Sequence, residues 1–326
     1  MRIESSPQAR PEYRKTTATP SKTFGQVMEA TKAQDRYVPG TPQPRTEPED
    51  FAGNRIYHGN VPVSNATHAK LKQLAVLNAQ ADYAGMSPDE ILSEIWNRYD
   101  EAFDGNMVAI TGGIAGPAEW CEVNRQFIDE INQHICYPEK RAAYQEAKNA
   151  GASGGSIDPE TYAEKRADSV YGHAFRKLFG YEGMNVEETE AAIREKYAGK
   201  NTTSDFLKMQ SELSQFGVLR HKMGDRADTY CAMLRNQFDE AFNPNSVYTV
   251  GHEKHSLMTA DQWYRVADQP FDTAKFAASM KENLHQVSGH NGWTEDYVKL
   301  LEGLFDHFIT GAIDESLDSL LSETNE

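Results

Sequence analysis

The sequence predicts a mainly α-helical protein with a multi-helix, bundle-like architecture and a few short strands. Helix start signals recur along the chain, among them the capping boxes Ser87-Pro88-Asp89-Glu90 and Thr259-Ala260-Asp261-Gln262. Apolar side chains recur at spacings of three and four residues, which places them on one face of a helix. One such stripe consists of Trp120, Val123, Phe127 and Ile131.

The first 54 residues form a separate region, which we predict to be a disordered, Pro-rich N-terminal arm. They contain seven of the fourteen prolines, and such a composition buries too little apolar surface to offset the entropy lost on ordering. Within the arm, helical spacing would place Phe24, Val27 and Met28 on one face. We expect this face to bind a protein partner by folding on it.

Local signals predict each element that follows the arm. Ile56 to Val61 reads as a small hairpin with a Gly-Asn turn. Helices are predicted to start at Ser87, Pro117, Pro138, Asp158, Asn185, Thr203, Asp225, Thr259, Asp272 and Thr294. The Gly/Ser-rich stretch Ala150–Ser156 is the best candidate boundary inside the folded part. The sequence thus predicts two helical halves, residues 55–150 and 151–326.

A repeated motif relates the two halves. Asn97-Arg98-Tyr99-Asp100-Glu101-Ala102-Phe103 returns as Asn236-Gln237-Phe238-Asp239-Glu240-Ala241-Phe242. Over sixteen aligned positions that end at Gly112 and Gly251, eight residues are identical. We expect both copies to form a helix, a turn and a short extended segment, with both phenylalanines buried.

Each copy of the motif carries three oxygen-bearing side chains at the same spacing. These candidate cation ligands are Asp100, Asp104, Asn106, Asp239, Asn243 and Asn245. A divalent cation such as calcium takes six to eight oxygen ligands, and the EF-hand spacing is not met. Turn-forming Asp and Asn side chains are the alternative interpretation.

A glycine-containing stretch, Met107 to Gly116, follows the first motif. Ile110 to Gly116 is similar to the Thr-Gly stretch of short-chain dehydrogenases, in which a helix N-terminus faces a pyrophosphate. Pro117 departs from that pattern, no alternation of strands and helices follows, and the second copy has no glycine cluster. We therefore expect no nucleotide cofactor here.

The C-terminal third contains four histidines that could bind zinc. They are His252, His255, His285 and His290, but HExxH is absent and the spacing matches no common zinc motif. The three cysteines, Cys121, Cys136 and Cys231, form no CxxC pair and read as free thiols.

The net charge of −16 bounds the possible partners. Residues 1–50 carry eight Lys/Arg and seven Asp/Glu, so the excess acid lies in the rest of the chain. An acidic surface repels phosphate backbones and anionic lipid, which argues against nucleic acid and membrane partners. The sequence has no apolar run of transmembrane length and no signal-peptide pattern, which predicts a cytoplasmic location.

These observations favour a non-enzymatic interaction or assembly protein that binds a protein partner. The alternative is a metal-dependent enzyme or a cation-binding protein that uses the repeated acidic motif or the C-terminal histidines. Neither a G-x-S-x-G elbow nor a recognised cysteine signature indicates nucleophilic catalysis.

Overall fold

The protein is described by a computed structural model that covers residues 51–57, 61–151, 158–242, 248–250, 253–255 and 258–312. All of these residues belong to one compact unit, Pro39–Glu326. The N-terminal arm, residues 1–50, lies outside the described residues, and so does the proposed partner-binding face of Phe24, Val27 and Met28.

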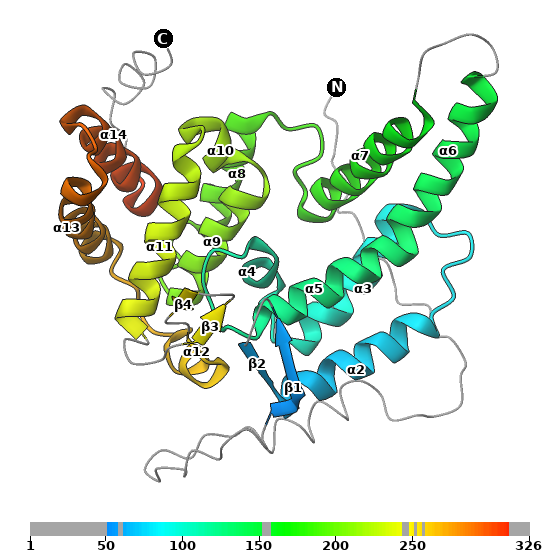
Figure 1. Ribbon diagram of the computed structural model, residues 1–326, viewed down its shortest axis with the longest axis horizontal. Helices are drawn as coiled ribbons and strands as arrows, with labels where there is room; N and C mark the ends of the chain where they lie inside the picture. Colours follow the sequence, from blue (N-terminus) through cyan, green and yellow to red (C-terminus); the bar gives the residue numbers. More distant parts are fainter. Residues whose placement is uncertain are drawn as a thin grey trace, which may run out of the picture. The chain divides into compact units, whose positions relative to one another are not determined.

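The mainly α-helical, bundle-like fold is confirmed (Figure 1). Two short antiparallel hairpins accompany the helices: β1 (Phe51–Tyr57) with β2 (Val61–Ser64), and β3 (Tyr248–Val250) with β4 (Glu253–His255). The helices before residues 152–157, which we call the first part, are α2 (Asn65–Ala79), α3 (Pro88–Ala102), α4 (Met107–Gly112), α5 (Trp120–Ile131) and α6 (Tyr137–Gly151). Those of the second part are α7 (Pro159–Phe179), α8 (Val186–Tyr197), α9 (Thr203–Gln215), α10 (Val218–Met223), α11 (Arg226–Phe242), α12 (Ala260–Val266), α13 (Thr273–Asn291) and α14 (Glu295–Phe305).

Most predicted helix starts are confirmed by the caps that the structure forms. Complete capping boxes open α3, α8 and α12 at Ser87, Asn185 and Thr259. Asp158, Asp272 and Thr294 cap α7, α13 and α14. The cap of α9 is Thr202 rather than Thr203, because the Thr202 hydroxyl accepts the backbone N–H of Asp205. Each such cap satisfies a backbone donor that a helix start leaves free.

Two predicted helix starts are wrong. Pro117 lies in a turn, and α5 begins three residues later at Trp120. Pro138 does not start a new helix, because α5 continues into α6 through a π-helical segment, η2 (Asn132–Cys136). Proline inside an α-helix lacks a donor and clashes with the carbonyl four residues before it. The wider turn of η2, in which Tyr137 N–H donates to Asn132 O, lies where that clash would occur.

Aromatic side chains form much of the core, and they join helices from both parts of the chain. Trp96 of α3 packs edge to face against Phe127 of α5 and Phe175 of α7, with ring centroids 5.7 Å apart in each pair. Phe175 in turn stacks on Phe216 at 5.5 Å. A second cluster joins α9, α11 and α13 through Phe206, Phe238, Phe271 and Phe276.

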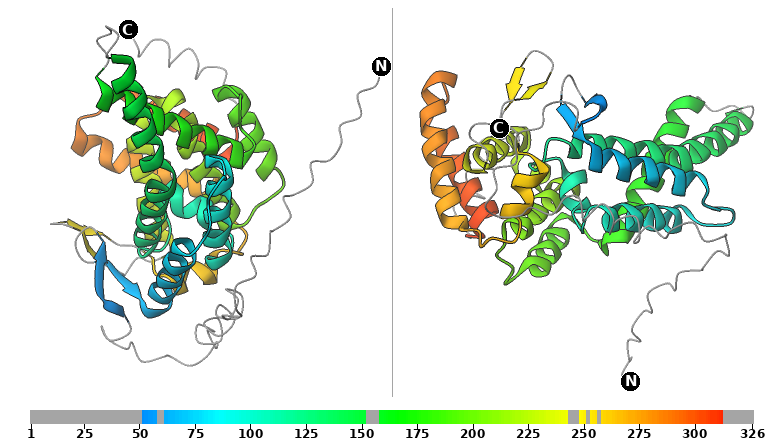
Figure 2. Two further views of the ribbon diagram at one scale, coloured as in Figure 1. Left: turned by 90° about the vertical axis from the view of Figure 1, so that its right-hand side faces the viewer. Right: turned by 90° about the horizontal axis from the view of Figure 1, so that it is seen from below.

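Helices α6 and α7 form an antiparallel pair on either side of residues 152–157 (Figures 1 and 2). Buried alanines fill the contact between them: Ala143, Ala147, Ala163 and Ala167. Small side chains let two helices approach closely, so this contact occupies one narrow flank of α6. The remaining circumference of α6 carries mostly exposed residues.

Candidate functional site

The first copy of the repeated motif ends α3 and starts α4. Asp104 and Gly105 adopt left-handed conformations, with φ of 55° and 74°, and this turn ends the helix. The Asn106 amide donates to Phe103 O at 2.8 Å, and Asp100 Oδ1 accepts the N–H of Met107 at 3.1 Å. These side chains therefore form a helix stop followed by a helix start, which is the turn-forming interpretation of the motif.

The second copy places its first aspartate in a more enclosed environment. Asp239 is 6% exposed on α11 and accepts a hydrogen bond from the backbone amide of Met258. Burial raises the pKa of its carboxyl to about 7, although the charge of Arg235 acts in the opposite direction. The other two candidate ligands of this copy, Asn243 and Asn245, lie outside the described residues.

The two copies share a role and then diverge. Asp100 and Asp239 each bind a backbone N–H of the segment that follows the motif helix. Met107–Gly112 is then the helix α4, whereas the equivalent part of the second copy contains the strand β3. The expectation of a common extended segment is wrong for the first copy. Phe103 is buried as predicted, and the side chain of Phe242 lies outside the described part.

No three His, Cys, Asp or Glu side chains within the described ranges come together in a group that could hold a metal ion. His285 lies 2.8 Å from Glu302, and the side chains of His252, His255 and His290 lie outside the described part. A cation site built from the repeated motif or these histidines stays a prediction.

The glycine stretch after the first motif forms a contact between helices. A Cβ on Gly112 would lie 2.3 Å from the Ser211 Cβ, so only glycine lets α4 approach α9 this closely. Arg235 of α11 donates to the carbonyls of Gly113 and Ile114, at 2.5 and 2.9 Å. The loop thus presents carbonyl oxygens to a cation, the opposite polarity to a phosphate-binding turn.

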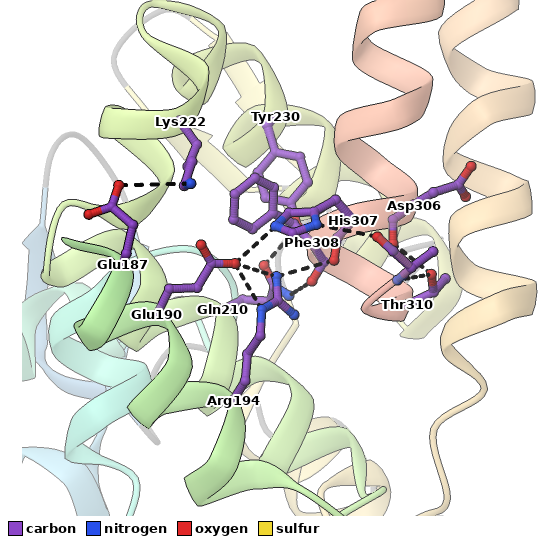
Figure 3. Close-up of polar contacts among 11 residues, drawn as sticks. Glu187, Glu190, Arg194, Gln210, Lys222, Tyr230, Asp306, His307, Phe308 and Thr310 are labelled. Carbon is purple, nitrogen blue, oxygen red and sulfur yellow. Dashed lines mark hydrogen bonds and ion pairs between the residues drawn. The ribbon is translucent and has the colours of Figure 1, made fainter. Parts of the chain in front are cut away.

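A polar network ties the last helical segment of the described residues, η3 (Asp306–Thr310), to α8 and α9 (Figure 3). Glu190 receives hydrogen bonds from Arg194 at 2.8 Å and from His307 at 2.9 Å. Gln210 donates to Phe308 O at 2.7 Å. Burial opposes ionisation of Glu190, but these donors and the Arg194 charge outweigh it and lower its pKa to about 2.

A second carboxylate, Glu212 of α9, is fully buried. It accepts hydrogen bonds from the hydroxyls of Tyr181 and Tyr197 and from Lys196 Nζ, the last at 2.6 Å. Burial raises the pKa of both phenols, and the neighbouring carboxylate adds to the effect. All these partners stabilise a charge that would otherwise be costly to bury, so we assign the cluster to folding.

A third cluster joins α2, α3 and η2. Arg98 donates to Asn78 Oδ1 at 2.6 Å and to the Tyr83 hydroxyl at 2.9 Å, and His134 lies 3.4 Å from Glu130. Burial raises the pKa of Glu130 to about 7 and that of Tyr83 to about 12, and it lowers the pKa of His134. Groups with shifted pKa values occur in structural ion-pair networks as well as in active sites, and here these groups connect three helical segments.

The outward face of α6 carries a different kind of group. Tyr137 and Tyr144 are 49% and 44% exposed, and they are two of the six large apolar side chains exposed within the described part. Three cationic residues, Lys140, Arg141 and Lys148, lie on the same side of the helix. With 100° between successive residues, these five positions fall within an arc of about 100°. We call them the α6 stripe.

The α6 stripe contains no acidic residue, although the protein carries a net charge of −16. Glu139 and Glu146 fall on the opposite side of the same helix, about 160–180° from Tyr137. Lys140 reaches Glu164 of α7 at 3.8 Å, and within the described residues Arg141 and Lys148 form no ion pair. The stripe therefore presents two aromatic rings and two unpaired cations to solvent.

Sequence reasoning missed this stripe because it searched for apolar faces and for acids. The signal was the spacing of Tyr137, Arg141, Tyr144 and Lys148, which recur at intervals of four, three and four residues. The pattern mixes aromatic and basic residues, so a search for a purely apolar stripe does not detect it.

Comparisons with known proteins add no relationship: no family model, no curated protein and no solved structure matches the chain. Among the described helices, none combines the length and the apolar character that crossing a bilayer requires.

Proposed function

We propose that this protein is a non-enzymatic interaction protein and that it binds an acidic segment of a protein partner through the α6 stripe. The observation that supports the proposal is the composition of the stripe, in which every member is a tyrosine or a cation. Tyr and Arg are enriched among the residues that contribute most to protein–protein binding. Their exposure on a helix whose other flank packs against α7 leaves them accessible.

Charge favours an acidic partner segment over a neutral or basic one. Arg141 and Lys148 are separated by two helical turns, so a partner with carboxylates at similar spacing can pair with both. The tyrosines supply apolar area with only two side-chain torsions to immobilise, which keeps the entropic cost of binding low. Since the chain carries a net charge of −16, a surface that contains cations and no acid repels an acidic segment less than the chain as a whole does.

The arm segment that contains Phe24, Val27 and Met28 remains a second proposed partner-binding segment. Its surroundings, residues 1–50, are close to neutral in charge, so it does not complement the α6 stripe. We therefore expect the arm to contact the partner at another place. Deleting residues 1–50 should leave the melting temperature of the folded part unchanged and weaken partner binding.

Site-specific photo-crosslinking tests the proposal for the stripe. A benzoylphenylalanine at position 144 is expected to crosslink a partner through a peptide rich in Asp and Glu, identified by mass spectrometry. The same probe at position 146, on the opposite side of α6, is the matched control and should give no such product. Arg141→Glu/Lys148→Glu should abolish the product at 144, whereas Glu139→Lys/Glu146→Lys should not.

The folding of each variant is checked by circular dichroism and by its melting temperature. The exposed positions of the stripe predict changes within about 0.5 kcal/mol in unfolding free energy, so loss of crosslinking would reflect binding. Equal crosslinking at 144 and 146, or a product at 144 that survives charge reversal, would refute the proposed site.

A further inference from the structure

The chain contains a segment whose chemistry matches the partner that the α6 stripe should bind. Residues 313–326, Ile-Asp-Glu-Ser-Leu-Asp-Ser-Leu-Leu-Ser-Glu-Thr-Asn-Glu, carry five acidic residues and no Lys, Arg or His. Its apolar residues recur at helical spacing: Ile313, Leu317, Leu320 and Leu321. The segment lies outside the described residues.

We infer that the α6 stripe of one copy binds residues 313–326 of a second copy of this chain. The inference rests on the proposed function and names the partner of the same surface. It commits the protein to self-association through a contact between Tyr137, Arg141, Tyr144 and Lys148 on one side and an acidic, leucine-containing segment on the other.

Matching spacing supports the assignment. Tyr137 and Tyr144 are seven residues apart, which corresponds to about 10 Å along a helix. Ile313 and Leu320 are also seven residues apart, so in helical form they could contact the two rings together. Asp314 and Asp318 would both lie on one edge of this apolar face, about 6 Å apart along a helix. Arg141 and Lys148 are about 10 Å apart, and their long side chains can reach towards the two carboxylates from either end.

Charge separates this segment from the other end of the chain. Residues 1–50 carry one net positive charge, which gives the cationic stripe no reason to bind them. Residues 313–326 carry five negative charges in fourteen residues. Electrostatic complementarity of this kind accelerates encounter and selects one partner segment over another.

The contacts of η3 favour a second copy over the same chain. In sequence the segment begins just after η3. Two contacts hold η3: His307 binds Glu190 of α8, and Asp306 binds Lys281 of α13, with 2.7 Å between Lys281 Nζ and Asp306 Oδ1. Helix α6 packs instead on α7 and η2. The last described residues before the segment are thus held by α8 and α13, which are not the helices that flank the stripe.

Two copies that exchange this segment would form two identical contacts related by a two-fold axis. Once the first contact forms, the second becomes intramolecular, so two weak contacts give a much tighter dimer than either alone. The association should weaken as salt is added, because exposed ion pairs are screened over about 8–10 Å at 0.1–0.15 M ionic strength.

Charge-swapped full-length chains test the inference by sedimentation velocity. The wild-type chain should form a dimer. Arg141→Glu/Lys148→Glu should weaken dimerisation roughly ten-fold or more, and so should Asp314→Lys/Asp318→Lys, because each variant places like charges at the contact. An equimolar mixture of the two variants should regain most of the wild-type association, since every contact then pairs opposite charges.

Two controls define the contact. Glu139→Lys/Glu146→Lys, on the opposite side of α6, should dimerise like the wild type. A synthetic peptide of residues 313–326 should compete with dimerisation, whereas a scrambled peptide of the same composition should compete at least ten-fold less well, because it loses the apolar spacing.

Three results would overturn the inference: a wild-type chain that is monomeric at all concentrations, a mixture of charge-swapped variants that does not recover, or a scrambled peptide that competes equally. A monomeric wild type whose α6 amides exchange faster after Asp314→Lys/Asp318→Lys would place the contact within one chain instead. If any of these results occurred while the probe at position 144 still crosslinked another protein through a peptide rich in Asp and Glu, the proposed function would stand. Absence of that product as well would end both.

Discussion

The imidazole of His307 lies 2.9 Å from the Glu190 carboxylate and thereby joins η3 to α8 across 117 residues of sequence. Arg194 completes the contact by donating to the same carboxylate oxygen and to the backbone carbonyl of His307, the latter at 3.2 Å. The C-terminal helices are thus fastened to α8 by a charged network (Figure 3), which makes their attachment dependent on pH.

Glu190 should therefore stabilise the fold in a defined pH range. Its pKa is lowered from 4.5 to about 2, so its stabilising effect is fully present above pH 4.5 and is lost as the pH falls towards 2. At 1.4 kcal/mol per pKa unit the effect is roughly 3 kcal/mol. Glu190→Gln should lower the unfolding free energy at pH 7 by up to that amount and flatten its pH dependence between 4.5 and 2, measured by urea denaturation. Unchanged pH dependence would contradict this role.

Asp239 should act in the opposite direction. Its pKa is raised from 3.8 to about 7, so ionisation penalises the folded state as the pH rises from 3.8, and the penalty is complete above 7. Asp239→Asn should stabilise the protein at pH 8 by an amount of the order of 1–4 kcal/mol and have little effect at pH 3.5. Asp268→Asn, at an exposed position, is the control and should leave the unfolding free energy unchanged at both pH 8 and pH 3.5. A destabilised Asp239→Asn at pH 8 would show that the charged form is required.

Local signals in the sequence were sufficient for the helix starts at Ser87, Asn185 and Thr259, because a capping box is formed by residues within one turn. The same reasoning failed at Pro138, since whether a proline starts a helix or is absorbed by a π-helical turn depends on what packs around it. It failed again at Met107–Gly112, where a run of four apolar residues, Met107–Ile110, is compatible with a strand or a buried helix.

The candidate site was harder to predict, since exposure is a tertiary property. Tyr137 and Tyr144 could equally have been core residues, and only the packing of Ala143 and Ala147 against α7 decides that the tyrosines face outwards. The equivalence of Asp100 and Asp239 was visible in the repeat. Asp100 binds the backbone amide seven residues further on, and Asp239 binds the one nineteen residues further on, and the sequence did not reveal either partner.

The hydroxyls of Tyr181 and Tyr197, which donate hydrogen bonds to Glu212, should each stabilise the folded protein. Tyr197 donates to Glu212 Oε1 at 2.8 Å inside the protein, where water does not replace a lost donor. Tyr197→Phe and Tyr181→Phe should each lower the unfolding free energy by about 1–3 kcal/mol. Tyr264→Phe, at a position 48% exposed, should change it by less than about 0.5 kcal/mol. Thermal denaturation of the three variants measures the difference, and equal effects at all three positions would contradict the role of Glu212.

Gly112 and Gly172 give a matched test of the contact between α4 and α9. Gly172 lies inside α7, where alanine should be favoured by about 1 kcal/mol on helix propensity alone, and Gly112 is the last residue of α4, where alanine is favoured less. At Gly172 nothing lies within 4 Å of the added Cβ, and Gly172→Ala should raise the melting temperature. At Gly112 the added Cβ would lie 2.3 Å from the Ser211 Cβ and 2.8 Å from its Cα, so α4 must move away from α9. Gly112→Ala should therefore destabilise the protein by roughly 1–3 kcal/mol.

The helix shift should also be visible at Arg235, whose guanidinium is held by the carbonyls of Gly113 and Ile114 just beyond Gly112. Amide exchange in α11 should accelerate in Gly112→Ala and remain unchanged in Gly172→Ala. Because Gln215 of α9 also donates to Val108 O of α4 at 2.7 Å, Gln215→Ala should produce a smaller change of the same kind. If Gly112→Ala proved as stable as Gly172→Ala, the close approach of α4 to α9 would not be a constraint on this fold, and the glycine stretch would need another explanation.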